Sequence, residues 1–224
     1  TVIFRNNNSE MLALEARIMF DGALAVDAVD VALDHSTNNI EADKEVEVKS
    51  LSNLKRILFV DSNILTSINF DSGIDAQSEI YTLDSSADGV DQISRYLYGK
   101  QGIDSIHIIS HGSEGQVNIG NTFLNTKNLP SYKVQLAEIG STLSGDGDIL
   151  LYGCNVAESA GREFIALLAS ATGADVAASG NLTGNIDVGG DWLLEVESGL
   201  IEDDTTLFSE YSGFSGLLTT PSVS

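Results

Sequence analysis

Two side chains of this sequence, those of His111 and Cys154, are of the types that carry out nucleophilic catalysis, and each directly follows an apolar run typical of a strand. Residues after neighbouring parallel strands meet at the same edge of a sheet, so the pattern predicts an imidazole beside a thiol. A free thiol has a pKa of about 8.5, and a nearby histidine can accept its proton or stabilise the thiolate. The pair therefore indicates a cysteine nucleophile with a histidine base.

Glycines flank both residues. Gly112 follows the histidine and Gly153 precedes the cysteine, which leaves room for the backbone close to the predicted site. The backbone amides of Gly112 and Cys154 could then form an oxyanion hole for the tetrahedral intermediate of an acyl transfer.

Cys154 is the only cysteine, so an intramolecular disulfide or a cysteine-rich metal site is excluded. The alternative to catalysis is a small buried hydrophobic side chain. No phosphate-binding loop, serine nucleophile elbow or zinc-binding His-Glu-x-x-His helix is present, and we expect neither a cofactor nor a metal. His107, inside an apolar run, is predicted to be a hydrogen-bonded core residue, and Trp192 a packing residue.

The chain is strongly acidic, with 33 acidic and 11 basic residues and a net charge of −22. This composition argues against binding of nucleic acid, which requires clustered Lys and Arg, and it is common in secreted bacterial surface proteins. No apolar run approaches the roughly 18 residues of a membrane span, and the N-terminus lacks the pattern of a Sec signal peptide. We expect a secreted or surface-located bacterial protein that is exported by another route.

Apolar runs and amphipathic segments alternate through the middle of the chain, which predicts an α/β fold with a largely parallel sheet in a three-layer α-β-α sandwich. The expected domain spans residues 55–200, preceded by an N-terminal segment at 1–21 and an acidic linker at 22–54, and followed by a tail at 201–224. The expected strands are 56–61, 79–83, 105–110, 148–152 and 175–178, with a short ribbon at 116–124, helices at 88–98, 129–143 and 157–172, and a late edge strand at 193–196.

Two sequence blocks, Ile106–Gly112 and Ile149–Cys154, each an apolar strand that ends in His-Gly or in Cys, resemble the signature of the clan CD cysteine peptidases, which include caspases, gingipains and separase. The match is closer to an uncharacterised caspase-like domain near the N-termini of giant repetitive bacterial surface proteins and adhesins. The features that carry this resemblance are Asp61-Ser62, the run from Asp88 to Ile93, Ser110-His-Gly-Ser113, Leu150-Leu-Tyr-Gly-Cys154 and Gly189-Gly-Asp-Trp192.

The segment from Leu14 to Asp21 resembles a Leu-Glu-Pro-Arg motif that precedes this domain in such proteins, with Ala16 in place of proline. Arg17 is then a processing site, a tethered pseudosubstrate or part of a docking segment. A pocket for arginine needs a carboxylate, and Asp61 and Asp148 are the acidic candidates. Asp61 has two further interpretations, as the residue that orients His111 and as a turn cap.

The leading hypothesis is a cysteine endopeptidase with His111 as base and Cys154 as nucleophile, which acts on peptides or on its own N-terminal segment. The alternative is a catalytically silent caspase-like module for secretion, folding or interaction in an adhesin. A third class, a calcium-dependent adhesive module, would show a large calcium-induced shift of the melting temperature, and we expect little shift.

Overall fold

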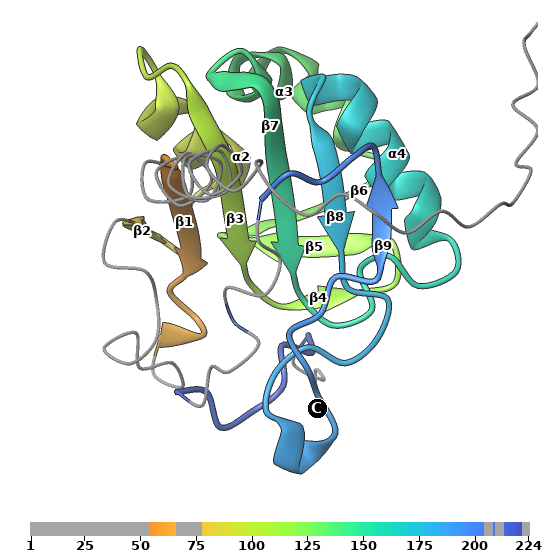
Figure 1. Cartoon of the computed structure of the whole chain (residues 1–224). Helices are drawn as coiled ribbons and strands as arrows, with labels where there is room; N and C mark the ends of the chain where they lie inside the picture. The colour runs from red at the N-terminus through yellow and green to blue at the C-terminus, as the bar shows by residue number, and fades with distance from the viewer. Residues whose placement is uncertain (1–53, 66–77, 204–207, 209–212, 221–224) are drawn as a thin grey trace, which may run out of the picture. The chain divides into compact units, whose positions relative to one another are not determined.

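The structure is a computed structural model that describes residues 54–65, 78–203, 208 and 213–220, and its centre is a six-stranded sheet (Figure 1). The strands lie in the order β2-β1-β3-β7-β8-β9, all parallel except β9, which runs antiparallel to β8. The predicted α/β class with a largely parallel sheet in a layered sandwich is confirmed. The strand bounds are β1 Arg56–Asp61, β2 Glu79–Leu83, β3 Ile103–Ile109, β7 Leu143–Tyr152, β8 Asp175–Ala178 and β9 Val196–Ser198.

Three helices pack on one face of this sheet and lie behind it in Figure 1. They are α2 (Gly89–Leu97), α3 (Lys133–Gly140) and α4 (Gly161–Thr172). Asp88 caps α2 by accepting a hydrogen bond from the Asp91 amide, and Gly173 ends α4 in the left-handed conformation, with φ 76°. Alternate strand residues meet the helices in a core of isoleucine and leucine side chains.

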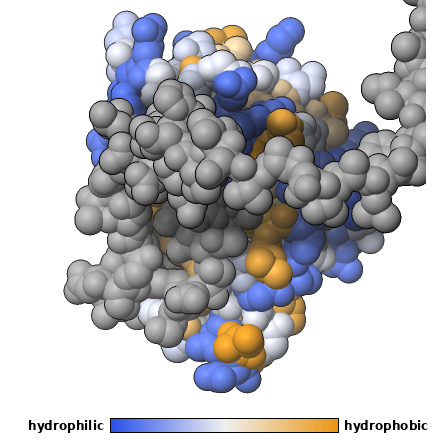
Figure 2. Space-filling model, viewed as in Figure 1, coloured by the Kyte–Doolittle hydropathy of each residue, from blue (hydrophilic) through white to orange (hydrophobic). Residues whose placement is uncertain are grey.

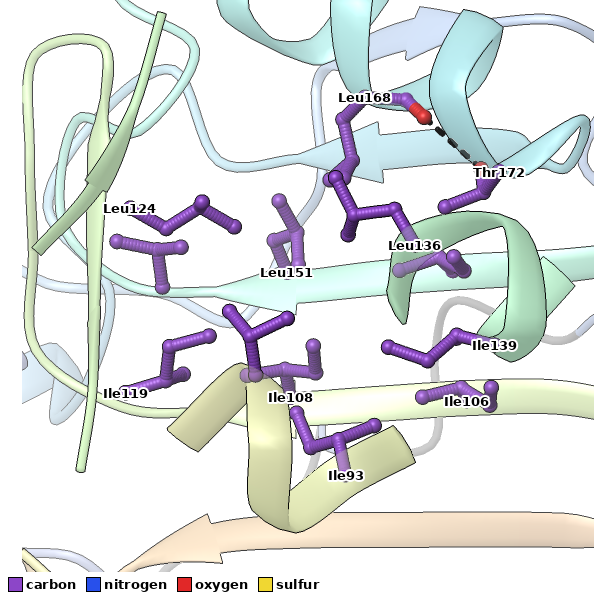
Figure 3. A pocket seen from close by; sticks show the side chains of 13 residues that line it. Ile93, Ile106, Ile108, Ile119, Leu124, Leu136, Ile139, Leu151, Leu168 and Thr172 are labelled. Atoms are coloured by element: carbon purple, nitrogen blue, oxygen red, sulfur yellow. Dashed lines mark hydrogen bonds between the residues drawn. The ribbon is translucent and has the colours of Figure 1, made fainter. Parts of the chain in front are cut away.

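That core contains a small cavity between the helices and the sheet (Figure 3). Its volume is about 20 Å³, close to the minimum needed to hold one water molecule. Ile93 from α2, Ile139 from α3 and Leu168 from α4 line it together with Leu151 from the sheet, and Thr172 is its only polar residue. The cavity is therefore a gap in the packing rather than a binding pocket.

The other face of the sheet is covered by segments near the C-terminus. Tyr152 lies in a buried cluster with Trp192, Phe208, Phe214 and Leu218, and the Trp192 and Phe208 ring centroids are 5.3 Å apart. The predicted packing role of Trp192 is confirmed. The core of the domain thus extends beyond residue 200, where the sequence analysis places a tail.

Several element bounds differ from the sequence predictions. The helix expected at 129–143 is a 3₁₀ turn, η2 (Leu129–Tyr132), followed by the shorter α3, in which the apolar Val134 is 68% exposed. Residue Leu143 already belongs to β7. α3 ends at Gly140, where a β-carbon would lie 1.7 Å from the Thr172 carbonyl oxygen, so the close contact with α4 requires glycine.

A second, three-stranded antiparallel sheet follows β3. It consists of β4 (Gly112–Ser113), β5 (Gln116–Ile119) and β6 (Thr122–Asn125), and its hairpin confirms the predicted ribbon. Because β4 starts at Gly112, this sheet begins at the carboxyl edge of the main one. Within the described residues, no helix has both the length and the apolar character needed to cross a membrane.

The lower part of the molecule in Figures 1 and 2 is a loop that contains the 3₁₀ turn η3 (Ile186–Val188). Figure 2 shows an apolar patch there, and Ile186 is 81% exposed and Val188 53% exposed. The stem of this loop, at Thr183 and Gly184, returns to the main sheet edge and takes part in the site described next.

Candidate active site

β3 and β7 are neighbouring parallel strands, as the sequence analysis assumed. Ile109 pairs with Tyr152 at their carboxyl ends, and His111 and Cys154 follow these two residues at equal distance along the chain. The Ser110 amide donates to the Tyr152 carbonyl oxygen at 3.0 Å and extends the pairing towards the site. The topology therefore delivers the imidazole and the thiol to the same sheet edge.

The two glycines allow the loops after these strands to touch. A β-carbon on Gly112 would lie 2.6 Å from Val156 Cγ2 and 2.8 Å from the Cys154 carbonyl oxygen. On Gly153 it would lie 3.0 Å from the Ser110 carbonyl oxygen. Because real side chains do not tolerate the first two distances, Gly112 is required for the close approach of the two loops.

The amides of Gly112 and Cys154 share one acceptor. Both donate to the carbonyl oxygen of Leu218, at 2.8 Å from the Gly112 nitrogen and 3.2 Å from the Cys154 nitrogen. Two N–H groups that converge on one carbonyl oxygen have the geometry of an oxyanion hole. The predicted donor pair thus points at a single position, and a peptide carbonyl of the chain itself occupies it.

The Cys154 thiol is buried, with the residue only 1% exposed. Its sulfur accepts a hydrogen bond from the Thr183 amide at 3.2 Å and donates to the Thr183 carbonyl oxygen at 3.4 Å. Burial raises the pKa of this thiol, and the nearby backbones of Thr183 and Leu218 offset part of that rise. With the chain in this arrangement the sulfur is therefore a neutral thiol at neutral pH.

The His111 ring lies against the backbone of Leu218 and Thr219. Burial lowers its pKa, and the Asp61 charge together with the backbone groups of Leu218 and Thr219 partly offsets this effect. Its Nδ1 atom is buried and has no hydrogen-bond partner among the described residues. The ring makes no hydrogen bond to the Cys154 sulfur, whose partners are both on Thr183; instead, imidazole and thiol both interact with Leu218.

Asp61, at the end of β1, holds the edge of the site in place. Its carboxylate, 1% exposed, accepts hydrogen bonds from the amides of Asn63 at 2.9 Å and Gly120 at 2.7 Å. Of its three interpretations, the turn cap is the one these bonds support, and the contact with Gly120 also fixes the β5–β6 turn. Its charge acts on His111 without a hydrogen bond between the two side chains.

Asp148 lies away from the dyad, towards the opposite end of β7. It pairs with Ser105 on β3 and Asp175 on β8, and its carboxylate accepts bonds from the amides of Glu202 at 3.0 Å and Asp203 at 2.9 Å. Burial raises its pKa to about 6. The structure therefore does not bring Asp148 to the site, and Arg17, its expected partner, lies outside the described residues.

His107 is a hydrogen-bonded core histidine, as predicted. Its Nε2 atom lies 2.9 Å from Asp203 Oδ2 and 3.0 Å from Ser105 Oγ, and Arg56 binds the same carboxylate at 2.6 Å. Burial alone would raise the pKa of Asp203, but the hydrogen bonds from His107, Arg56 and Ser105 outweigh it and lower that pKa. The role of Asp203 could not be predicted from the sequence because this residue stands in the expected tail, 201–224.

Thr183 and Leu218 were also missed as parts of the site. Both contribute backbone atoms, and backbone groups leave no signature in residue type. The sequence feature that came nearest to indicating them is the Gly189–Trp192 block, which lies between Thr183 and Leu218 in the chain.

These features define an α/β protein in which a cysteine, a histidine and two backbone amides that share one acceptor lie at the carboxyl edge of a parallel sheet. Residues 57–218 match the family described as "Domain of unknown function (DUF4347)", and the chain belongs to that family. No curated protein matches the chain significantly. A solved structure titled "Crystal structure of a small-chain dehydrogenase" aligns at 13% identity over 53% of this chain and 77% of the other, with a TM-score of 0.27, a likeness too weak to carry an argument.

Proposed function

We propose that this protein is a cysteine endopeptidase in which Cys154 is the nucleophile and His111 the acid-base catalyst. The observation that carries the proposal is the convergence of the Gly112 and Cys154 amides on one peptide carbonyl oxygen next to the Cys154 thiol. The Cys154 amide binds this oxygen at 3.2 Å, so the same residue would supply one oxyanion donor and the nucleophile. The sequence resemblance to clan CD peptidases supports the same roles.

In the proposed reaction each group has a step. The Cys154 thiol gives its proton to His111 as the sulfur adds to the carbonyl carbon, and the Gly112 and Cys154 amides stabilise the negative charge that develops on the oxygen. One such donor typically contributes about 10² to 10³ in rate. His111 lies against the backbone of Leu218 and Thr219, the two residues that the peptide bond joins. It delivers the proton to the leaving amine. Water then releases the acyl group from the sulfur.

A second candidate function, a catalytically silent caspase-like module, is favoured by the burial of Cys154. A thiol that is 1% exposed and hydrogen-bonded to Thr183 is not accessible to an external substrate in this arrangement. The two functions differ in what happens when a peptide competes for the amide pair. In the peptidase the thiol becomes reactive, whereas in the silent module it stays inert.

Labelling with peptide electrophiles tests the proposal. The intact protein is incubated at pH 7.5 with a panel of peptidyl ketones that differ in the residue before the reactive carbon, and modified Cys154 is counted by mass spectrometry. We expect saturable labelling that is lost in the unfolded protein and slowed at least about 100-fold in His111→Ala, the scale of a lost general acid or base. Equal rates for folded protein, unfolded protein and a peptide-free alkylating agent would refute the proposal.

The expected setting is an exported bacterial surface protein. The net charge of −22 and the resemblance to domains of giant adhesins support it. In such a protein a peptidase domain would act on the polypeptide that carries it or on exposed peptides nearby.

A further inference from the structure

The C-terminal segment, residues 213–220, lies across the site in the manner of a bound peptide. It runs antiparallel to the loop stem at residues 183–185. The Leu218 amide donates to the Thr183 carbonyl oxygen at 2.9 Å, and the Asn185 amide donates to the Gly216 carbonyl oxygen at 2.9 Å. Peptides commonly bind by adding a strand to an exposed edge in this way.

Beyond Leu218 the segment continues past the site. Thr219 forms a parallel bridge with Gly112, and the Thr220 amide donates to the Gly112 carbonyl oxygen at 3.4 Å. The polypeptide is therefore held on both sides of one peptide bond, between Leu218 and Thr219. This is the bond whose carbonyl oxygen the two amides bind.

The side chain before this bond is buried in an apolar cluster. Leu218 is fully buried, in the cluster that contains Tyr152, Trp192 and Phe214, whereas Thr219 after the bond is exposed. A buried leucine anchored next to an exposed residue fits a specificity pocket for a large apolar side chain.

Two glycines make room for the segment. A β-carbon on Gly184 would lie 2.4 Å from the Gly216 carbonyl oxygen, and one on Gly190 would lie 2.7 Å from Leu217 Cδ2. Gly190 belongs to the Gly189–Trp192 block and Trp192 to the pocket cluster. This block of the sequence is thus explained as part of the surface that receives the segment.

We propose that the peptide bond between Leu218 and Thr219 is a substrate of Cys154 in the same chain, so that the protein cuts itself after Leu218; this inference rests on the proposed peptidase function. The Cys154 sulfur forms a bond to the Leu218 carbonyl carbon as its proton passes to His111. The carbon–nitrogen bond then breaks, and His111 gives the proton to the Thr219 nitrogen. Water hydrolyses the thioester, which leaves a Leu218 carboxylate and restores the thiol.

A cut within one chain tolerates a thiol whose pKa is raised by burial. The reacting groups are held together, and well-oriented intramolecular reactions reach effective concentrations of about 10⁵ M or more. A single slow event is enough for processing. Release of the new Leu218 carboxylate from the two amides would then free the sulfur and the amides for other peptides.

The test uses the full chain with a compact reporter protein fused after Ser224, purified and incubated at pH 6 to 9. We expect the intact mass to fall to a fragment that ends at Leu218, with a reporter fragment that begins at Thr219, at a rate independent of protein concentration. Cys154→Ala stays whole. Leu218→Asp slows the cut at least about 100-fold because a charge would have to be buried in the apolar cluster, whereas Leu218→Met, which keeps an apolar side chain of similar size, slows it far less. Ser215→Ala, at an exposed position of the segment, is the matched control.

The outcomes separate the two proposals. If peptide electrophiles label Cys154 but the bond after Leu218 stays whole over days, the segment blocks the site without being cut. The self-cleavage inference then fails while the peptidase function stands. If neither labelling nor cutting occurs in a protein that folds, both fail. Cutting at the same bond in Cys154→Ala would assign the event to another protease and overturn the inference.

Discussion

Cys154 interacts with Leu218 through two groups. Its amide donates a hydrogen bond to the Leu218 carbonyl oxygen at 3.2 Å, and the Leu218 backbone lowers the pKa of its thiol. One residue thus supplies both the electrophile-binding group and the nucleophile, and a bound peptide necessarily covers the sulfur. The burial of Cys154, which on its own suggests an inert thiol, is in part a consequence of an occupied site.

The pH dependence of self-cleavage should be a broad plateau. The reaction needs one proton shared between His111 and Cys154, so the rate falls below the pKa of the histidine and above that of the cysteine. Burial lowers the first and raises the second. We therefore expect the acid limb below the ordinary histidine value of about 6.5 and the alkaline limb above about 8.5. Single-turnover rates from pH 4.5 to 10 would show this, and an acid limb above pH 7 would contradict it.

Gly112→Ala should abolish activity with the fold retained. The new β-carbon would lie 2.8 Å from the Cys154 carbonyl oxygen, so the two loops must separate and the shared hydrogen bonds to Leu218 must lengthen. We expect a loss of at least about 100-fold in labelling and cutting, the effect of one lost oxyanion donor. Gly145→Ala is the control, because a β-carbon there meets nothing within 4 Å. Equal activity of the two variants would show that the amide pair is not part of the machinery.

The sequence predicted those parts of the structure that depend on local pattern. β1, β2 and β8 match their predicted ranges because turn residues bound each of these short runs, and the adjacency of β3 and β7, which the prediction of the site assumed, is confirmed. The role of Leu218 could not be predicted, because it acts through a backbone carbonyl that meets Gly112 and Cys154 across the fold. Leu217 and Leu218 stand in a Gly-, Ser- and Thr-rich stretch that has no periodicity indicating which of them is buried.

Asp203→Asn should destabilise the fold strongly. Asp203 is bound by Arg56 at 2.6 Å and by His107 at 2.9 Å with both partners buried, and the amide nitrogen of asparagine would face these donors. Breaking one partner of a buried ion pair costs about 3–5 kcal/mol. Since the pKa of Asp203 is lowered, its contribution is present at neutral pH and is lost only in strong acid. Urea unfolding at pH 7 measures the effect, with exposed Asp187→Asn as control; a change below about 1 kcal/mol would contradict it.

Asp148→Asn should have the opposite effect, with a pH dependence of its own. Burial raises the pKa of Asp148 to about 6, so the folded protein favours the protonated side chain. That favourable contribution is complete below the unfolded pKa of about 3.9 and disappears as the pH rises through 6.

Asparagine cannot ionise, but its oxygen can still accept hydrogen bonds from the Glu202 and Asp203 amides. Its NH₂ group can face the carboxylates of Asp175 and Glu202, whose oxygens lie within 4.8 Å of the Asp148 carboxylate. We therefore expect Asp148→Asn to raise the melting temperature at pH 8 and to leave it unchanged at pH 4. The exposed neighbour Asp146→Asn serves as the matched control and should show no such difference. A gain of the same size at both pH values would mean that the charge of Asp148 is not what strains the fold.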